Sequence, residues 1–421
     1  DCAASADFGV AIDYPGRNGG PAIKEDGAIA SASLTKVRGD ARLLEEMGRK
    51  TQNLNDPAVL PRYFAAAASL HSETAVITGY DVRMDMGLPS PLIARLESFQ
   101  GKDFGLLACG PSIWTKVSLN FLGQDMFTAA SMSLERMSLP DIFTPIYASR
   151  ASGDPVKEGE AVLQGFTDAL AKEPFVMRGL VMNDVAITLP SAEPITLKSG
   201  RMDLELGGGK CVFNQNVEDL VLPPFAYRNL DAIGAMLGAA YGKPLRLRAN
   251  AETVSEWKDG GLAVEGKKYS LSDPELGGIT ADFNLLFRAP GADSLMSLLQ
   301  SAEPELLLKN AHVTFEDRSV LALTFKYFYE EAKRGAITVP DAQSPEALRA
   351  EAARQCRNEA DEAANPDKKA ILQGVVQLLE RSGILTIDLN PDEPMPLDIF
   401  EAIDADLSGG YKIRTSYVPT P

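Results

Sequence analysis

Short rows of alternating apolar and polar residues recur along most of this 421-residue chain. The longest row places an apolar residue at every second position: Ile279, Ala281, Phe283, Leu285 and Phe287. Polar residues such as Asp282 and Asn284 stand between them. Side chains of a β-strand point to opposite faces in turn, so the row predicts a strand with one apolar and one polar face. A sheet of such strands must cover its apolar face with a second sheet, with helices or with a ligand.

Similar rows begin at Tyr80 and Val117 and predict further strands. The strongest helical signal is the Ala-, Glu- and Gln-rich stretch 344–381, which is broken at Asn365–Pro366 because proline cannot continue a helix. Weaker patterns predict helices at 41–52, 61–70, 154–172, 229–242 and 290–300. The sequence therefore predicts a β-dominated α+β fold, with extended antiparallel amphipathic sheets and helices packed on one face.

Three regions differ in pattern: a mixed N-terminal segment (1–72), a β-rich domain (73–224), and an α+β domain (225–421) that contains the helical stretch 344–381. Within the β-rich domain, residues 133–140 (SLERMSLP) resemble residues 216–223 (NVEDLVLP), and each follows a strand pattern and a glycine-containing turn. This predicts a duplicated strand unit, with chance similarity between amphipathic strands as the alternative. Gly207–Gly209 predicts a hairpin turn.

Composition narrows the classes of partner. A formal net charge of −17 argues against nucleic acid and against adsorption to an anionic membrane, because both need clustered Lys and Arg. The longest apolar run, 232–241, is about half of the roughly 20 residues that span a bilayer, so we expect no transmembrane segment. The chain opens on Asp1 rather than Met, which predicts that an export signal has been removed and that the protein is periplasmic or extracellular.

Four cysteines lie far apart in the sequence: Cys2, Cys109, Cys211 and Cys356. None forms the Cys-x-x-Cys pair that is typical of zinc or thioredoxin-type sites. In an oxidising compartment they are candidates for up to two disulfides, with three pairings open. The alternative is four inert buried thiols.

Candidate chemistry is sparse. The only histidines are His71, which begins a polar His-Ser-Glu turn, and His312, which lies opposite Ala311 and Val313 in a predicted strand and should face solvent. Two histidines leave little room for a His-based triad or a multi-histidine metal site, and no nucleotide-binding or nucleophile motif occurs. We assign no catalytic or cofactor-binding residue and expect a protein that is not an enzyme.

One segment copies half of a calcium-binding loop. Asp404, Asp406 and Ser408 supply oxygens at the first, third and fifth positions, and glycine follows at the sixth. The twelfth position is Thr415, where an EF-hand needs a bidentate glutamate, and 411–417 has a strand pattern. The segment is a candidate calcium half-site, with an Asp-rich helix end followed by a turn as the alternative.

Residues 306–332 (LLLKNAHVTFEDRSVLALTFKYFYEEA) lead through the long helical stretch to 383–397 (GILTIDLNPDEPMPL). This last third of the chain resembles uncharacterised bacterial envelope proteins of the YdgA-like and AsmA-like groups. The resemblance implies a non-enzymatic periplasmic domain with a long curved sheet whose apolar face holds lipid. The chain departs from the AsmA-like pattern because it lacks a membrane helix and carries more internal helix.

These observations favour an exported, non-enzymatic protein that binds lipid or another apolar ligand on a sheet face. The alternative is a structural subunit of a surface assembly, in which exposed strand edges bind a second copy or an envelope protein. A carboxylate-based hydrolase is the third hypothesis, because 58 acidic residues allow many carboxylate pairs.

Overall fold

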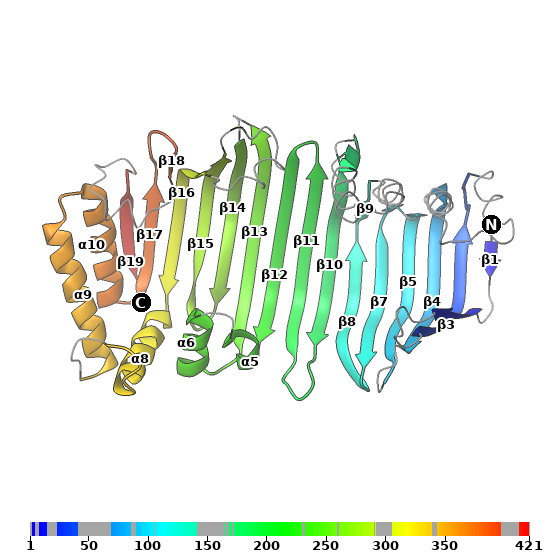
Figure 1. The fold of residues 1–421 in the computed structure, drawn as a ribbon, viewed down its shortest axis with the longest axis horizontal. Helices are drawn as coiled ribbons and strands as arrows, with labels where there is room; N and C mark the ends of the chain where they lie inside the picture. Colours follow the sequence, from blue (N-terminus) through cyan, green and yellow to red (C-terminus); the bar gives the residue numbers. More distant parts are fainter. Residues whose placement is uncertain are drawn as a thin grey trace. The chain divides into compact units, whose positions relative to one another are not determined.

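The computed structural model describes residues 2–4, 8–14, 23–40, 69–85, 90–105, 107–140, 165, 168–170, 172–229, 232–258, 261–289, 291, 305–338, 343–396 and 412–420. The chain divides into two compact units, residues 1–212 (unit 1) and residues 213–421 (unit 2). Strands predominate and pair antiparallel in both units (Figure 1). The predicted β-dominated α+β fold is confirmed.

Unit 1 is built almost entirely of strands: β1 (Cys2–Ala4), β2 (Phe8–Tyr14), β3 (Ile23–Thr35), β4 (His71–Asp85), β5 (Leu92–Gly105), β6 (Ala108–Cys109), β7 (Ser112–Phe121), β8 (Gln124–Leu134), β9 (Arg136–Ser138), β10 (Phe175–Ile187) and β11 (Ile195–Gly207). The strands β3, β4, β5, β7, β8, β10 and β11 pair in that order. Both β1 and β2 pair with β3, while β9 pairs with β6 and β10.

One level across the unit 1 sheet breaks the simple two-residue alternation. Gly79 in β4, Lys116 in β7 and Asp184 in β10 all have positive φ. The registers align them: Gly79 and Lys116 lie on either side of Glu97, and Lys116 and Asp184 on either side of Ala130. We call these three positions the left-handed level.

The alternation of buried and exposed residues slips by one at this level. In β5, Phe99 is buried and Leu96 is partly buried. The residue that follows each of them along the chain, Gln100 and Glu97 respectively, is exposed. The apolar residues of one face are therefore three apart across the level instead of two. This corrects the strict period of two that the sequence rows imply.

Strand β12 (Lys210–Leu222) contains the boundary between the units. The turn before it uses Gly208 and Gly209, whose φ angles of 59° and 75° suit the left-handed conformation of a two-residue turn. The predicted turn at Gly207–Gly209 is confirmed.

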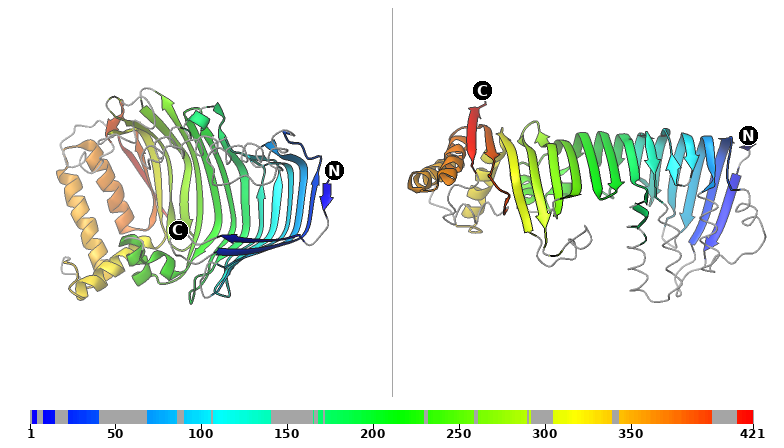
Figure 2. Two further views of the ribbon diagram at one scale, coloured as in Figure 1. Left: turned by 45° about the vertical axis from the view of Figure 1, so that its right-hand side comes forward. Right: turned by 90° about the horizontal axis from the view of Figure 1, so that it is seen from above.

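Unit 2 alternates strands and helices: α5 (Pro224–Tyr227), α6 (Ala232–Ala240), β13 (Leu245–Lys258), β14 (Gly261–Asp273), β15 (Gly277–Arg288), β16 (Glu305–Asp317), α8 (Val320–Lys333), α9 (Pro345–Glu362), α10 (Pro366–Glu380), β17 (Gly383–Leu389), β18 (Met395–Pro396) and β19 (Arg414–Pro419). Its sheet runs β13, β14, β15, β16, β17 and β19, with β18 also paired to β16. Figure 2 shows α9 and α10 side by side.

Helix α10 contacts strands of this sheet at several points. Its residue Ile371 packs on a cluster that includes Leu308 and Leu389, and a Cβ added to Gly374 would lie 2.7 Å from the side chain of Leu385. Thr415 of β19 donates a hydrogen bond to the carbonyl of Ala370 at 3.0 Å. A second cluster, which includes Leu237 of α6 and Leu245 of β13, packs against Leu323 and Tyr327 of α8.

Local sequence rules account for the helix boundaries. Ser344 caps α9 by accepting a hydrogen bond from Ala347 N, and Asn365 caps α10 by accepting from Asp367 N and Lys368 N. A proline follows each cap at the first helical position, where its missing N–H costs nothing. The break predicted at Asn365–Pro366 is confirmed.

Other predictions fare differently. The helix expected at 229–242 is present as α6 with narrower bounds. His71 is the first residue of β4 and pairs with Gly105, so the turn expected there is wrong. The helices expected at 41–52 and 290–300, and most of those at 61–70 and 154–172, lie outside the described residues. No helix in the described part of the chain has the length and apolar character needed to cross a membrane.

Candidate functional site

The first candidate site is an apolar sheet face in unit 1, formed by two rows of side chains that run across six strands. One row lies on one side of the left-handed level: Ala32, Ile77, Phe99, Trp114, Met132 and Met182. The other lies on the opposite side of that level: Ile29, Tyr80, Leu96, Val117, Ala129 and Val185. We call these twelve residues the apolar face of unit 1. None of them carries a charge.

Burial on this face is uneven. Phe99 is 3% and Ala129 2% exposed, but Trp114 and Met132, which follow Phe99 in its row, are only partly buried. The ring of Phe99 lies 5.3 Å from that of Trp114 and 5.2 Å from that of Phe104, so aromatic contacts hold this part of the face together. The face therefore presents apolar area that the described residues do not bury completely.

The opposite face of the same sheet carries a continuous polar row. A row of hydroxyl and amide side chains crosses seven strands: Ser31, Thr78, Ser98, Thr115, Ser131, Asn183 and Ser199. Neighbours in this row hydrogen-bond across strands, for example Ser31 to Thr78 at 2.6 Å and Ser98 to Thr115 at 2.7 Å. Lys116 adds an exposed ion pair with Glu97 at 3.0 Å. Because these groups satisfy one another, the polar row explains sheet pairing and not ligand binding.

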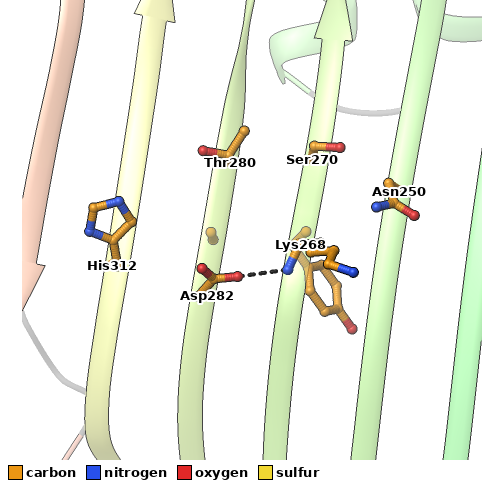
Figure 3. A pocket seen from close by; sticks show the side chains of 8 residues that line it. Asn250, Lys268, Ser270, Thr280, Asp282 and His312 are labelled. Atoms are coloured by element: carbon orange, nitrogen blue, oxygen red, sulfur yellow. Dashed lines mark hydrogen bonds between the residues drawn. The ribbon is translucent and has the colours of Figure 1, made fainter.

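The second candidate site is a depression of about 330 Å³ in unit 2. It is lined by Asn250, Lys268, Tyr269, Ser270, Thr280, Ala281, Asp282 and His312. Figure 3 shows that its labelled side chains come from four neighbouring strands, β13 to β16. The pairings Asn250–Ser270, Ser270–Thr280 and Asp282–His312 bring these residues together.

A local irregularity in β14 shapes this depression. The register between β13 and β14 shifts between Asn250 and Glu252, and Lys268 has a φ of 53°. The backbone N–H of Lys268 donates to Asp282 Oδ1 at 2.6 Å, while its ammonium group pairs with Glu252 at 2.7 Å. The ring of Tyr269 packs instead on Phe283, with centroids 5.0 Å apart, and its hydroxyl bonds Thr253.

His312 lies at the edge of the depression and is half exposed, as the sequence predicts for a residue opposite Ala311 and Val313. Its Nδ1 lies 2.6 Å from Asp388 Oδ1 on β17. A proton on Nδ1 makes this contact a hydrogen bond and leaves Nε2 free to accept one. His71, in unit 1, lies 3.7 Å from Asp103 and takes part in neither candidate site.

The described residues leave the candidate calcium half-site untested and show three of the four cysteines as thiols. Asp404, Asp406 and Ser408, the candidate calcium half-site, lie outside the described residues, and so does the side chain of Cys2. Cys109, Cys211 and Cys356 are free thiols, and burial raises the pKa of each. Within the described ranges, no group of three or more His, Cys, Asp or Glu side chains is arranged to hold a metal ion.

Sequence reasoning predicted a ligand on an apolar sheet face but located neither candidate site. The alternating rows pointed to apolar strand faces, but they did not show which faces the described residues leave partly exposed. The depression in unit 2 depends on strand order and on the irregularity at Lys268, and no local motif reports either. Lys268 stands between a lysine and a tyrosine, and a lysine does not indicate a left-handed backbone conformation as a glycine or an asparagine would.

Comparison with known proteins adds one match. A family model described as "Uncharacterized protein" matches residues 271–408, which include β15, β16, the helices α8 to α10 and β17. None of the curated proteins matches this chain. The fold therefore defines a class only at the level of a β-dominated α+β protein with extended antiparallel pairing.

Proposed function

We propose that this protein is a non-enzymatic binding protein that holds lipid acyl chains on the apolar face of unit 1. The observation that carries the proposal is the pair of uncharged rows that cross six strands while Trp114, Met132 and their neighbours stay partly exposed. Burying such side chains is worth about 25 cal/mol per Å² of apolar area. A long apolar ligand is suited to supply that burial along a continuous strip.

Unit 2 supports the proposal by contrast. In unit 2, protein side chains bury the apolar residues of the strands, because α10 lies on the apolar side of β17 and β19 and completes the cluster around Leu308. We propose that helices pack on one face of the sheet in unit 2 and that acyl chains take the equivalent position in unit 1. An apolar ligand without a fixed hydrogen-bond pattern matches a face that offers no charged side chain.

Tryptophan fluorescence tests this proposal directly. The chain has two tryptophans, Trp114 on the apolar face of unit 1 and Trp257 in β13 of unit 2. In the variant Trp257→Phe, a brominated fatty acid bound on the proposed face should quench the remaining Trp114 emission. In Trp114→Phe, the emission of Trp257 should change far less. Equal quenching in both variants, or none in either, would contradict the proposal.

A matched pair of substitutions on β8 controls for non-specific effects. Met132 belongs to the apolar face of unit 1, whereas the next residue, Ser133, pairs with Ile113 and Val181 in a row of the opposite face. Met132→Glu should abolish quenching of Trp114 because a carboxylate would be desolvated against the acyl chain. Ser133→Glu should leave it unchanged. Mass spectrometry of organic extracts should find lipid in the parent protein and in Ser133→Glu, but not in Met132→Glu.

We propose a periplasmic or cell-surface location, on the resemblance of residues 306–332 and 383–397 to YdgA-like and AsmA-like envelope proteins. Fractionation of cells that express the tagged full-length gene product tests it. The protein should appear with the periplasmic or surface fraction, and recovery with a cytoplasmic marker enzyme would contradict the location without bearing on lipid binding.

A second candidate function, assembly through a strand edge, is favoured by β19. This strand pairs with β17, no other described strand pairs with it, and Val418 is 59% exposed. An open edge of this kind is a template for strand addition by another chain. Light scattering at increasing concentration should then show association that Val418→Lys reduces. A strict monomer at all concentrations would remove this candidate.

A further inference from the structure

The depression in unit 2 has a chemistry that neither the apolar face of unit 1 nor the open edge of β19 explains. Its labelled side chains offer hydroxyl, amide, carboxylate and imidazole groups within one small volume of about 330 Å³ (Figure 3). That volume is at the lower end of the range of ligand pockets, roughly 300–1,000 Å³. We propose that this depression binds a neutral polyhydroxylated ligand, a sugar residue.

The charges around the depression decide against an anion. The ammonium group of Lys268 is neutralised by Glu252 at 2.7 Å, and His312 is paired with Asp388 at 2.6 Å. Asp282 is the remaining charge on the lining. A phosphate or carboxylate ligand would therefore approach the carboxylates of Asp282, Glu252 and Asp388 while the ammonium group of Lys268 is already engaged, which is unfavourable.

The hydrogen-bonding groups favour vicinal hydroxyls. One oxygen of Asp282 accepts from Lys268 N, and the other points away from Lys268 in Figure 3. A carboxylate oxygen accepts from a sugar hydroxyl in a charge-assisted hydrogen bond, which is stronger than a neutral one. Thr280 and Ser270 lie directly opposite each other on β15 and β14, so their hydroxyls can both donate and accept.

Asn250 and His312 extend this set on either side. Asn250 pairs with Ser270, and its amide supplies both a donor and an acceptor. His312 Nε2 accepts when Nδ1 donates to Asp388. Tyr269 also lines the depression, but its ring is packed on Phe283, so we assign it no stacking contact with the ligand. We therefore expect binding in the millimolar range rather than tighter.

Ligand-observed NMR on the full chain tests the proposal. Saturation transfer is measured to methyl β-glucoside, methyl β-galactoside and myo-inositol, with inorganic phosphate as the anionic comparison. At least one of the three polyols should show transfer. Asp282→Asn and Thr280→Val should each weaken its binding about tenfold, because each removes one hydrogen-bonding partner of the ligand.

The matched control is Thr314→Val. Thr314 lies next to Thr280 in the same cross-strand row, but its hydroxyl bonds Thr386 and it does not line the depression. This variant should bind the polyol like the parent, and circular dichroism should show all three variants folded. Absence of transfer to every polyol, transfer unchanged in both Asp282→Asn and Thr280→Val, or stronger binding of phosphate would each overturn the proposal.

Discussion

The two units are made of similar amphipathic strands but bury their apolar residues differently. Unit 2 contains three clusters of buried apolar side chains, and residues such as Leu308 and Leu286 are almost inaccessible. In the described part of unit 1, a few buried residues such as Phe99 lie in rows that consist mostly of partly exposed residues such as Trp114. The comparison shows that an alternating strand pattern makes an apolar face, whereas the elements packed against it decide whether a core forms.

The difference extends to polar groups. In unit 2, the carboxylates of Asp273, Asp317 and Asp367 are buried, and one oxygen of each accepts a backbone hydrogen bond that joins a strand or helix end to its neighbour, while the second oxygen of Asp367 has no hydrogen-bond partner among the described residues. The buried polar side chains described in unit 1 are the hydroxyls of Ser72 and Ser112. Buried charges need several partners, and only a packed layer of helices and strands supplies them.

The largest effect should come from Asp317, which is fully buried where β16 meets α8. It accepts from Leu321 N at 3.0 Å and Ser382 Oγ at 2.9 Å, and lies 3.6 Å from Arg349. Asp317→Ala removes the carboxylate beside the largely buried guanidinium of Arg349 and leaves it with carbonyl partners, so we expect a loss of about 3–5 kcal/mol in the free energy of unfolding, measured with urea.

The neighbouring Glu316→Ala serves as the control for that loss. Glu316 forms an ion pair with the half-exposed Arg318 at 2.8 Å, and such pairs are worth at most about 1 kcal/mol. Similar losses for the two variants would show that the buried carboxylate of Asp317 stabilises unit 2 no more than the exposed ion pair of Glu316 does.

The next largest effect should come from shortening apolar side chains, which should cost more stability in unit 2 than in unit 1. Leu308 is 1% exposed in the unit 2 core, so Leu308→Ala should cost about 2–5 kcal/mol. Met132→Ala in unit 1 should cost about 1 kcal/mol, because Met132 is only partly buried before the change. Urea unfolding of both variants checks this, and equal costs would mean that the apolar face of unit 1 is as well packed as the unit 2 core.

A smaller effect should be common to both units. Lys116 in unit 1 and Lys268 in unit 2 have positive φ, where a Cβ costs roughly 1–2 kcal/mol. At each position, the free energy of unfolding measured with urea should therefore be about 1 kcal/mol higher for the glycine variant than for the alanine variant. Both substitutions remove the same ion pair, so the comparison isolates the backbone. A more stable alanine variant, as expected for an ordinary strand, would contradict the left-handed conformation.

The smallest effect concerns Tyr241 near the C-terminal end of α6. Burial, followed by the charge of Asp273, raises its pKa to about 12. Because the folded pKa is raised above the usual value of about 10, the stabilisation is complete below that pH and is lost as pH rises through the folded value. Ultraviolet titration of the folded protein should show a late-ionising phenol that Tyr241→Phe removes. A phenol that ionises at the usual pH would contradict this burial.

Particular residues show how far sequence reasoning reached. The exposed position of His312, the strand β15 and the break between α9 and α10 follow from local pattern, because alternation and helix caps act within a few residues. The left-handed level could not be found in this way. It aligns a glycine, a lysine and an aspartate from three strands, and the alignment exists only after the strands have paired.

The amino-acid pattern alone determined that this protein is β-dominated, that its strands have one apolar face, and where its C-terminal helices begin and break. These properties come from side-chain direction and backbone sterics, which depend on neighbouring residues. Only the tertiary structure decided that Ile371 of α10 packs on the cluster around Leu308, that Trp114 and Met132 stay partly exposed, and that Asp282, Thr280 and Asn250 line one depression. The reason is that burial and convergence depend on which distant segments pair, and the strand rows along the chain are too alike to specify that.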